Sequence, residues 1–290
     1  LGTACHVRGA ARVVEKMANP RSGIIEFVPS TPAANAERIT DLLGPHSPWR
    51  VTTVAATGST NEDLAELARH GGRAGEVLIA EHQQAGRGRF ARVWQSPPGT
   101  SLSTSVLLRP RRASLDWGWL SLLVGLAVTD GLRSLGAEDR IQLKWPNDAL
   151  IDGKKVCGIL SELVVTDLGN AAICGWGINV SFDESELPVP QATSLLLSGL
   201  PIDKDQVAAA ILGRLGDLYT RWDAGAELSA EYAAGCATVG RRVRVHLDAQ
   251  SPDSPSVSGQ AVGIGPNGEL LVDLGGQIES FAAGDVVHLR

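Results

Sequence analysis

Apolar residues recur along the chain with the period of strands in some stretches and of helices in others, and the alternation becomes regular from about Val51. Residues 1–50 are rich in Ala, Pro and Arg; we expect only a short helix over 36–43 and a linker over 44–48 there. Runs of β-forming residues predict strands over 76–82, 101–108, 141–145, 149–151, 156–165 and 171–180. Helical spacing predicts helices over 59–69, 117–135, 207–223 and 228–234.

Local signals mark the ends of several of these elements. Ser59-Thr60-Asn61-Glu62 has the spacing of a capping box, which opens a helix. Asp203 is the expected cap of a second helix, and Gly136 lies just past the end of the long apolar one. The dipeptide Asp152-Gly153 stands between two strand-like runs and therefore predicts a tight hairpin.

The character of the sequence changes at about Cys236. The runs that follow it are short and of β type, and turns rich in Gly and Asn separate them: 241–247, 258–264, 269–274 and 277–281. Strands and helices without strict alternation predict an α+β main domain, and the final stretch predicts a small β-barrel. We therefore expect a partly disordered N-terminal extension over residues 1–50, a main domain over 51–235 and a barrel over 236–290.

Composition narrows the class of protein. The chain has 290 residues, of which 43% are hydrophobic and 20% charged, and this is typical of a globular protein. A formal net charge of −6 disfavours a bulk basic surface for nucleic acid. Because no run of about 18 consecutive apolar residues is present, we expect no transmembrane helix. The four cysteines form no Cys-x-x-Cys pair, which disfavours a zinc site and favours a reducing cytosol.

A loop rich in Gly and Arg carries the first candidate chemistry. Residues 83–92 read Gln-Gln-Ala-Gly-Arg-Gly-Arg-Phe-Ala-Arg and follow a predicted strand. The loop is neither a Walker A motif, since no Gly-Lys-Ser/Thr follows, nor a dinucleotide fingerprint, since the third glycine is missing. Flexible backbone carrying guanidinium groups can close over a phosphate or a carboxylate. A mobile, solvated loop is the alternative interpretation.

Three further motifs follow strands. Lys144-Trp145-Pro146-Asn147-Asp148 leaves polar side chains at a sheet edge, or else forms a simple Asx turn. In residues 153–160, Lys154 and Lys155 face opposite sides because successive residues of a strand alternate between its two faces. One lysine can therefore enter a cleft; alternatively, both are solvated charges of a hairpin. The glycines of Gly175-Trp176-Gly177-Ile178-Asn179-Val180 indicate close approach of a ligand or another backbone, or else a bulge.

Together and in this order, these motifs resemble the blocks of the biotin protein ligases. The matching blocks are Ser59-Thr60-Asn61 and residues 83–92, 144–148, 153–160 and 175–180, and the resemblance covers about residue 51 to the C-terminus. It implies a mixed-sheet catalytic domain of the biotin/lipoate ligase type followed by an SH3-like barrel. It also implies the reaction: biotin and MgATP give biotinyl-5′-AMP and pyrophosphate, and biotin then passes to a lysine of a biotin carboxyl carrier domain. The partners would be acyl-CoA or pyruvate carboxylases.

The resemblance also assigns roles to single residues. The catalytic residues would be Lys155, Arg89 and Asp148. Asp148 would help to deprotonate or orient the acceptor lysine, or hold Mg²⁺, with no other protein ligand for the metal. Biotin would be bound by Ser59, Thr60, Asn61, Gln83, Gly86, Arg87, Gly88, Arg89, Lys155 and Gly158. ATP and the adenylate would be bound by Arg87, Arg89, Arg92, Trp94, Lys144, Asn147 and Asn179, with Trp94 stacked on adenine and Asn179 at its edge.

One departure from the family pattern stands in the loop. The family sequence reads Gly-Arg-Gly-Arg-x-Gly-Arg, whereas Ala91 replaces the last glycine here. Alanine tolerates positive φ poorly, so we expect a different closing conformation or ordering energy.

Three other functions agree less well with the sequence. A lipoate ligase shares the chemistry, but its Arg-Arg-x-Ser-Gly-Gly-Gly-type block is missing. A ligase that is also a repressor would need a winged helix before Val51, and residues 1–50 contain few large apolar residues; we therefore expect the monofunctional form, with no DNA or membrane partner. A non-enzymatic scaffold leaves the Gly-Arg loop unexplained.

We expect a cytoplasmic protein that is a monomer or a homodimer. Met17 is the only methionine, so we expect translation to begin there, with residues 1–16 as an extension.

Overall fold

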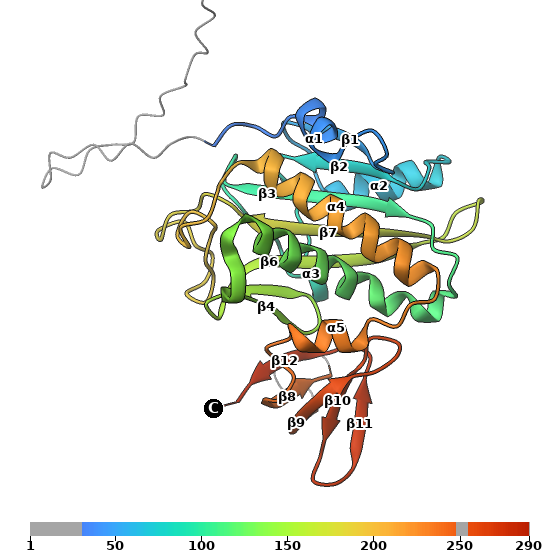
Figure 1. Ribbon diagram of the computed structural model, residues 1–290, viewed down its shortest axis with the longest axis vertical. Coiled ribbons are helices and arrows are strands. Elements are labelled where there is room, and N and C mark those ends of the chain that lie inside the picture. The colour runs from blue at the N-terminus through green and yellow to red at the C-terminus, as the bar shows by residue number, and fades with distance from the viewer. Residues whose placement is uncertain (1–30, 248–254, 290) are drawn as a thin grey trace, which may run out of the picture. The chain divides into compact units, whose positions relative to one another are not determined.

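The computed structural model of the protein describes residues 31–247 and 255–289, and the compact unit begins at Thr31 (Figure 1). The proposed translation start at Met17 lies outside the described residues. The main domain is built on a seven-stranded sheet in the order β1-β2-β3-β7-β6-β5-β4. Only β1 and β2 are parallel. The strands are β1 (Arg50–Val54), β2 (Glu76–Ala80), β3 (Ser101–Leu108), β4 (Ile141–Lys144), β5 (Asp148–Ile151), β6 (Lys154–Val164) and β7 (Ala171–Asn179).

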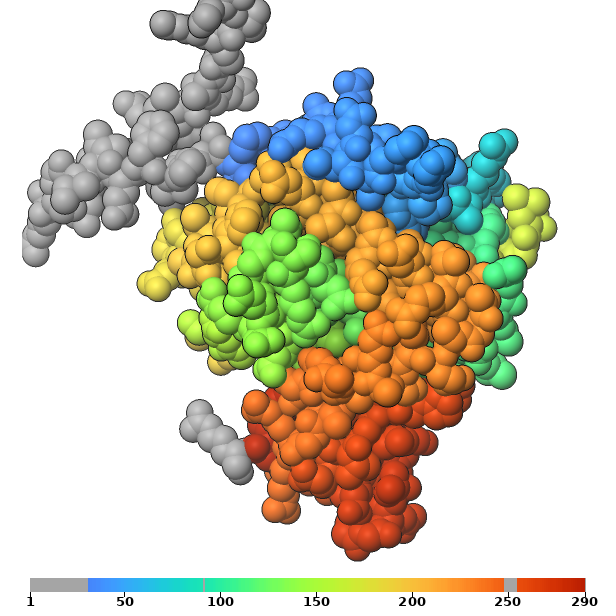
Figure 2. Space-filling view, viewed as in Figure 1, coloured from blue at the N-terminus to red at the C-terminus, as the bar shows by residue number. Residues whose placement is uncertain are grey.

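Helices cover both faces of this sheet. On one face lie α3 (Trp119–Leu132) and α4 (Lys204–Asp223), which Figure 1 shows crossing the strands. Figure 2 views the same side, where the side chains of these two segments adjoin and cover the sheet. On the other face, α2 (Thr60–Arg69) packs through Leu64, Ala65 and Ala68. The remaining helical elements are α1 (Ala36–Leu43), α5 (Ser229–Ala234), the short 3₁₀ turns Arg89–Ala91, Ser114–Gly118 and Glu138–Arg140, and the π turn Arg133–Ala137.

Strand β7 supplies the core on both faces, and every one of its residues is buried. Cys174 and Ile178 belong to the larger cluster under α3 and α4, whereas Ala171 and Ile173 belong to the smaller cluster under α2. Side chains alternate because successive residues of a strand point to opposite faces. The central strand therefore needs no polar outer side.

Helix α3 is apolar on nearly all sides. The stretch Ser114–Arg140 has the length and mean hydropathy of a membrane span, which counting consecutive apolar residues did not reveal. However, 67% of its most apolar window is buried inside the protein, so α3 is a core helix. A helix that is hydrophobic all round is expected wherever it is enclosed by sheet and neighbouring helices.

The part of the expected N-terminal extension that the structure describes is integrated into the main body. Helix α1 has the predicted bounds and packs on α4. Trp49 is buried and its Nε1 donates to the Leu212 carbonyl at 2.7 Å. The Asp205 carboxylate accepts from the Asn35 backbone N–H at 2.7 Å. These contacts are long-range, which is why weak local periodicity over residues 31–50 did not reveal them.

The C-terminal part is a five-stranded antiparallel sheet in the order β11-β10-β9-β8-β12. Its strands are β8 (Arg242–His246), β9 (Ser256–Ile264), β10 (Leu270–Asp273), β11 (Ile278–Phe281) and β12 (Asp285–His288). The prediction missed β12, as it missed β1, because each is short and alternates with polar residues. Trp119 and Trp145 anchor this barrel to the main domain, donating from Nε1 to the carbonyls of Pro266 at 2.6 Å and Gly268 at 2.9 Å.

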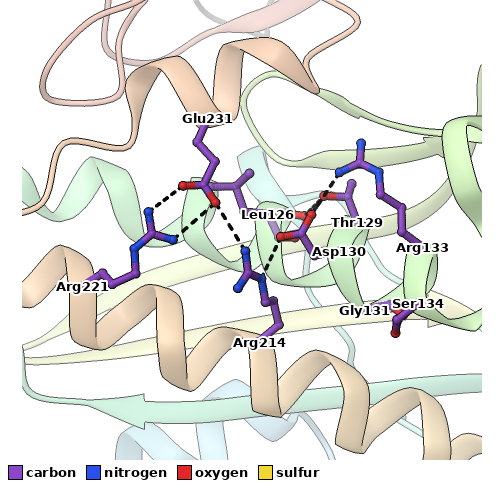
Figure 3. A network of polar contacts seen from close by, with 10 residues as sticks. Leu126, Thr129, Asp130, Gly131, Arg133, Ser134, Arg214, Arg221 and Glu231 are labelled. Carbon is purple, nitrogen blue, oxygen red and sulfur yellow. Dashed lines mark hydrogen bonds and ion pairs between the residues drawn. The ribbon is translucent and has the colours of Figure 1, made fainter.

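An ion network ties the helices together on the face away from α2 (Figure 3). Asp130 on α3 accepts from Arg133 at 3.0 Å and from Arg214 of α4 at 2.8 Å. Arg214 reaches Glu231 of α5 at 3.4 Å, and Arg221 pairs with the same carboxylate at 2.7 Å. Because α5 leads into the barrel, the network fixes the helix that precedes it.

Candidate active site

A cavity of about 280 Å³ opens between α2, the Gly-Arg loop and strands β6 and β7. It brings together residues that lie more than 100 positions apart in the sequence. Gly86 and Lys144 are not part of the lining. The predicted residues that do line it are Ser59, Thr60, Asn61, Gln83, Arg87, Gly88, Arg89, Arg92, Trp94, Asn147, Asp148, Lys155, Gly158 and Asn179.

Glycines of the central strands make room for side chains. Gly158 and Gly177 are direct partners across β6 and β7, and the Trp94 ring lies on both. A Cβ at Gly177 would stand 2.6 Å from Trp94 Cε2, and one at Gly175 would stand 2.0 Å from Asn61 Oδ1. Close approach was predicted here, and the approaching groups are the side chains of Trp94 and Asn61.

A β-bulge directs Lys155 into the cavity. Across β5 and β6, Ala149 pairs with Cys157 but Leu150 pairs with Lys155, so Val156 is an extra residue. Strict alternation from Gly158 would have placed Lys154 on the cavity side. Instead Lys154 is exposed, whereas Lys155 lines the cavity and its Nζ lies 2.6 Å from Asp148 Oδ1.

Each arginine of the loop is held by an acceptor from elsewhere in the protein. Arg87 pairs with Glu162 at 3.2 Å. Arg89 Nη1 donates to the Gly284 carbonyl at 3.2 Å, and Arg92 pairs with Asp285 at 2.5 Å. Burial lowers the pKa of Arg89, while the charges of Asp285 and Asp148 act to raise it. Because guanidinium groups stay protonated, the loop presents three cations at the cavity.

The backbone of the loop shows where the positive φ falls, while the expected difference in closing conformation or ordering energy at Ala91 stays a prediction. The residue in the left-handed region is Phe90, with φ 55° and ψ 43°. Ala91 is not among the residues with positive φ in the described part of the chain. The strain therefore falls one residue earlier, and the Arg89 guanidinium stacks over the Phe90 ring with Cζ 4.8 Å from its centroid.

The start of α2 differs from a capping box. The Ser59 side chain caps no backbone group. Instead Gln83 Oε1 accepts from the Thr60 backbone N–H at 2.8 Å. A side chain from the loop after β2 thus satisfies a free N–H at the start of the helix, which joins the two segments that line this end of the cavity.

The other predicted residues have mainly structural contacts. Asn147 Nδ2 donates to the Ile159 carbonyl and Asn179 Nδ2 to the Thr193 carbonyl, each at 2.9 Å. Gly86 closes the loop, since its carbonyl accepts from the Trp94 backbone N–H at 2.8 Å. Lys144 ends β4 opposite Asp148, outside the cavity lining.

Sequence reasoning missed Ser105, Glu162 and Asp285. Glu162 follows Gly158 at even spacing on one strand, so period two could have placed it on the same face. Asp285 lies on the unpredicted β12, and no local signal connects it with the loop. Ser105 is a fully buried polar residue within a strand, which only tertiary structure explains.

A mixed sheet, with a small antiparallel sheet following it in the chain, thus directs one lysine and three arginines at a single cavity. The sequence profile of the biotin/lipoate A/B protein ligase family matches residues 55–179, and that of the biotin protein ligase C-terminal domain matches residues 238–289. The chain belongs to the biotin protein ligase family. The fold expected from the resemblance is therefore confirmed.

Individual relatives agree with this assignment. The chain is 42% identical to the biotin–[acetyl-CoA-carboxylase] ligase of Mycobacterium tuberculosis over 86% of its own length and 93% of that protein. It is 32% identical to the bifunctional ligase/repressor BirA of Bacillus subtilis, over 85% of its length and 75% of that protein. The solved biotin protein ligase from Aquifex aeolicus, in complex with biotin and ATP, superposes with a TM-score of 0.69 at 26% identity, covering 83% of this chain and 99% of that one.

Proposed function

We propose that the protein joins biotin to ATP, giving biotinyl-5′-AMP and pyrophosphate, and then transfers biotin to a lysine of a biotin carboxyl carrier domain of a carboxylase. The observation that carries this proposal is the convergence of Lys155, Arg87, Arg89 and Arg92 on one cavity. These side chains come from β6 and from a loop after β2, so the fold has gathered cations from distant segments.

The first step requires such charges. A biotin carboxylate oxygen attacks the α-phosphorus atom, and the bond from that phosphorus to the bridging oxygen of pyrophosphate breaks. Two unit negative charges ~4 Å apart repel by roughly 4 kcal/mol at an effective dielectric constant near 20. Lys155 is placed to offset this repulsion, because its ammonium group is compact and can contact both the carboxylate and the phosphate.

The end of the cavity near α2 suits the polar ring of biotin. Ser59, Thr60 and Asn61 are buried there beside Gln83, and they offer hydroxyl and amide groups. Ile159 and Leu160 add an apolar wall for the rest of the ligand. Trp94 is assigned to adenine: its indole Nε1 is buried without a hydrogen-bond partner in the part of the chain that the structure describes. An unpartnered donor of this kind costs free energy that a ligand acceptor would recover.

Mg²⁺ accompanies ATP in this proposal. The described residues contain no group of three or more His, Cys, Asp or Glu side chains suited to a metal. Asp148 and Asp285 are the carboxylates in the cavity lining. A metal held by one or two carboxylates and by substrate phosphates is the usual protein site for Mg²⁺, so the residues fit this role. When bound, the ion would neutralise phosphate charge.

In the second step, the acceptor lysine amine attacks the biotinyl carbonyl and AMP leaves. Asp148 is assigned to orient that amine, since its carboxylate lines the cavity and already pairs with Lys155.

We assign the protein to the monofunctional type, which acts in the cytoplasm as a monomer or homodimer and does not bind DNA. Burial raises the pKa of the Cys157 and Cys174 thiols, which leaves them poorly reactive and compatible with that compartment.

The experiment that tests the function is Mg²⁺-dependent exchange of labelled pyrophosphate into ATP, with biotin or lipoate added. We expect exchange with biotin alone. Exchange with lipoate alone would keep the reaction and replace the substrate, and exchange with neither would contradict the adenylation step. Specific binding of the purified protein to an operator sequence would contradict the monofunctional assignment.

A further inference from the structure

Lys155 stands on β6 just before the part of the strand that pairs with β7. The register between these two strands begins at Cys157, which lies opposite Ile178. Past this point the chain of β7 turns toward the start of β3, since the Val180 N–H donates to the Thr100 carbonyl at 2.9 Å. The partners of the Lys155 backbone on this side therefore come from another segment.

Residues 191–193, which we call the bridging segment, supply these partners. The Lys155 N–H donates to the Gln191 carbonyl, and the Thr193 N–H donates to the Lys155 carbonyl, each at 2.8 Å. Ala192 lies opposite Lys155 in a parallel bridge, is buried and lines the cavity. A bulge disrupts the regular ladder of a sheet at the residue it displaces. The bridging segment thus holds the lysine backbone at the point where the bulge turns its side chain into the cavity.

Asn179, the last residue of β7, holds the bridging segment from the other side. Its side chain is only 3% exposed, and Nδ2 donates to the Thr193 carbonyl at 2.9 Å. A flipped amide would place Oδ1 against that carbonyl, and both are acceptors, so only one orientation is favourable. Thr193 therefore accepts from Asn179 through its carbonyl and donates to Lys155 through its N–H.

We propose that Asn179 is a positioning residue for Lys155: it fixes Thr193, which in turn fixes the backbone of the lysine and the direction of its ammonium group. The inference rests on the proposed function, because it concerns the adenylation step that Lys155 serves. It differs from the contact with adenine that the resemblance implies for Asn179, since here the residue acts through the protein and not on the nucleotide.

The first test is Asn179→Leu, which keeps the approximate size of the side chain and removes the donor. A misplacement of about 1 Å can cost on the order of 100-fold in rate. Because Asp148 still pairs with Lys155 in the variant, we expect kcat of biotin-dependent pyrophosphate exchange to fall about tenfold, with the KM values for biotin and ATP changed less than about twofold. A raised KM for ATP with unchanged kcat would overturn the proposal, because it would show a direct contact with the nucleotide.

A double-mutant cycle shows whether Asn179 acts through the lysine. In a Lys155→Ala background no ammonium group remains to be misplaced, so Asn179→Leu should lower the residual exchange less than about twofold. A purely structural role, or a contact with ATP, predicts the same loss in both backgrounds. A further tenfold loss in the Lys155→Ala background would therefore overturn the proposal.

Ser198→Ala is the matched control. Ser198 Oγ lies 3.2 Å from Thr193 Oγ1, so this variant also removes a neutral hydrogen bond from Thr193 but leaves both of its backbone contacts in place. We expect exchange to change less than about twofold. A loss equal to that of Asn179→Leu would overturn the proposal, because any loosening of the bridging segment would then suffice.

Hydrogen exchange of the backbone amides tests the positioning without substrate. In Asn179→Leu the Lys155 amide should exchange at least about tenfold faster, the equivalent of one hydrogen bond of about 1.4 kcal/mol. The Ile159 amide, which donates to the Asn147 carbonyl at 2.9 Å, should keep its rate. Unchanged protection of Lys155 would overturn the inference.

Asn179→Ala covers the case in which the leucine variant does not fold. It removes the same donor without adding bulk, and we expect kcat to fall at least about threefold; an unchanged kcat would contradict the role of Asn179. Pyrophosphate exchange by the unmodified chain tests the proposed function separately. Its absence would contradict that function, whereas amide exchange in the variants would still decide whether Asn179 positions Lys155.

Discussion

The two faces of the seven-stranded sheet are built on different principles, although they share every strand. Under α3 and α4 the side chains are apolar and closely packed, and the charged groups lie at the outer side in the closed network of Asp130, Arg214 and Glu231 (Figure 3). Under α2 only a smaller apolar cluster forms, and beside it, next to the Gly-Arg loop, glycines of the strands leave room for a cavity that charged side chains line.

The difference shows on which face of the sheet a bound substrate can replace the protein partners of the charged side chains. On the helix face, Asp130, Arg214 and Glu231 pair with one another and with neighbouring arginines, away from the cavity. On the cavity face, the contacts of Arg87, Arg89 and Lys155 are with carboxylates or carbonyls, and a substrate carboxylate or phosphate can take the place of each. On the cavity face, protein acceptors therefore occupy positions that substrate groups can take. On the helix face, the contacts of the charged groups are structural.

The largest effect is expected for the two neighbouring lysines. Lys155→Ala should lower biotin-dependent pyrophosphate exchange by at least about 100-fold, the usual scale for removing one preorganised charge from a transition state. Lys154→Ala should change it less than about twofold, since Lys154 is exposed. Equal losses would mean that the bulge at Val156 does not select the functional lysine.

A second pair of variants compares the faces on adjacent residues of β7. Ile178→Ala opens a hole in the helix-side core and should cost about 2–5 kcal/mol of unfolding free energy, with KM for biotin and ATP unchanged in the folded fraction. Gly177→Ala forces the Trp94 ring to move, because a Cβ would stand 2.6 Å from it, and should raise the KM for ATP with a smaller loss of stability. Denaturant unfolding and steady-state kinetics on both variants measure this; the opposite pattern would invalidate the division into two faces.

The contact between loop and barrel should have a moderate effect. Asp285→Asn removes the negative charge that Arg92 pairs with. The pair is half-exposed, so the change should cost less than about 1 kcal/mol of stability. The loop should become more sensitive to trypsin at Arg89 and Arg92 in the absence of ligands. Asp273→Asn, which changes a turn of the same barrel, is the control. An unchanged cleavage rate in Asp285→Asn would show that the loop is held without the barrel.

The smallest effect concerns pH. Burial, reinforced by Lys144 and Arg241, lowers the pKa of His288 from 6.5 to about 4. The unfolded chain therefore binds a proton at higher pH than the folded one, and stability is lost as pH falls from about 6.5 toward 4. His288 Nε2 lies 3.0 Å from Thr238 Oγ1, where the neutral ring can accept. His288→Gln should flatten the decline of Tm over this range in calorimetry, and an unchanged slope would refute the assignment.

Much of the architecture could be predicted because its signals are local. Asp152 and Gly153 both have positive φ, as the hairpin interpretation requires, and the Asp203 carboxylate caps α4 as expected. The predicted opposite orientation of Lys154 and Lys155 also agrees with their exposure. Strict alternation from Gly158, however, would favour Lys154, because the bulge at Val156 that turns Lys155 into the cavity cannot be recognised from the residue types.

The parts that escaped prediction depend on distant contacts. Asp285 reaches the loop from almost 200 positions away, on a strand too short and too polar to recognise. Ser105 appeared as an ordinary β-forming residue, although it connects two groups of the cavity. The capping interpretation of Ser59 failed because Gln83 competes for the same helix end, which is a tertiary override of a local rule.

The strict alternation along β7 has a consequence for how this gene can change over time. Substitutions within the strand affect one face at once, and selection can act on support and on chemistry separately. One inserted or deleted codon among its 9 residues would exchange the two faces together, moving Asn179 or Gly177 into the core and Ile178 into the cavity. Descendants of this sequence should therefore vary in residue type along β7 while keeping its length constant.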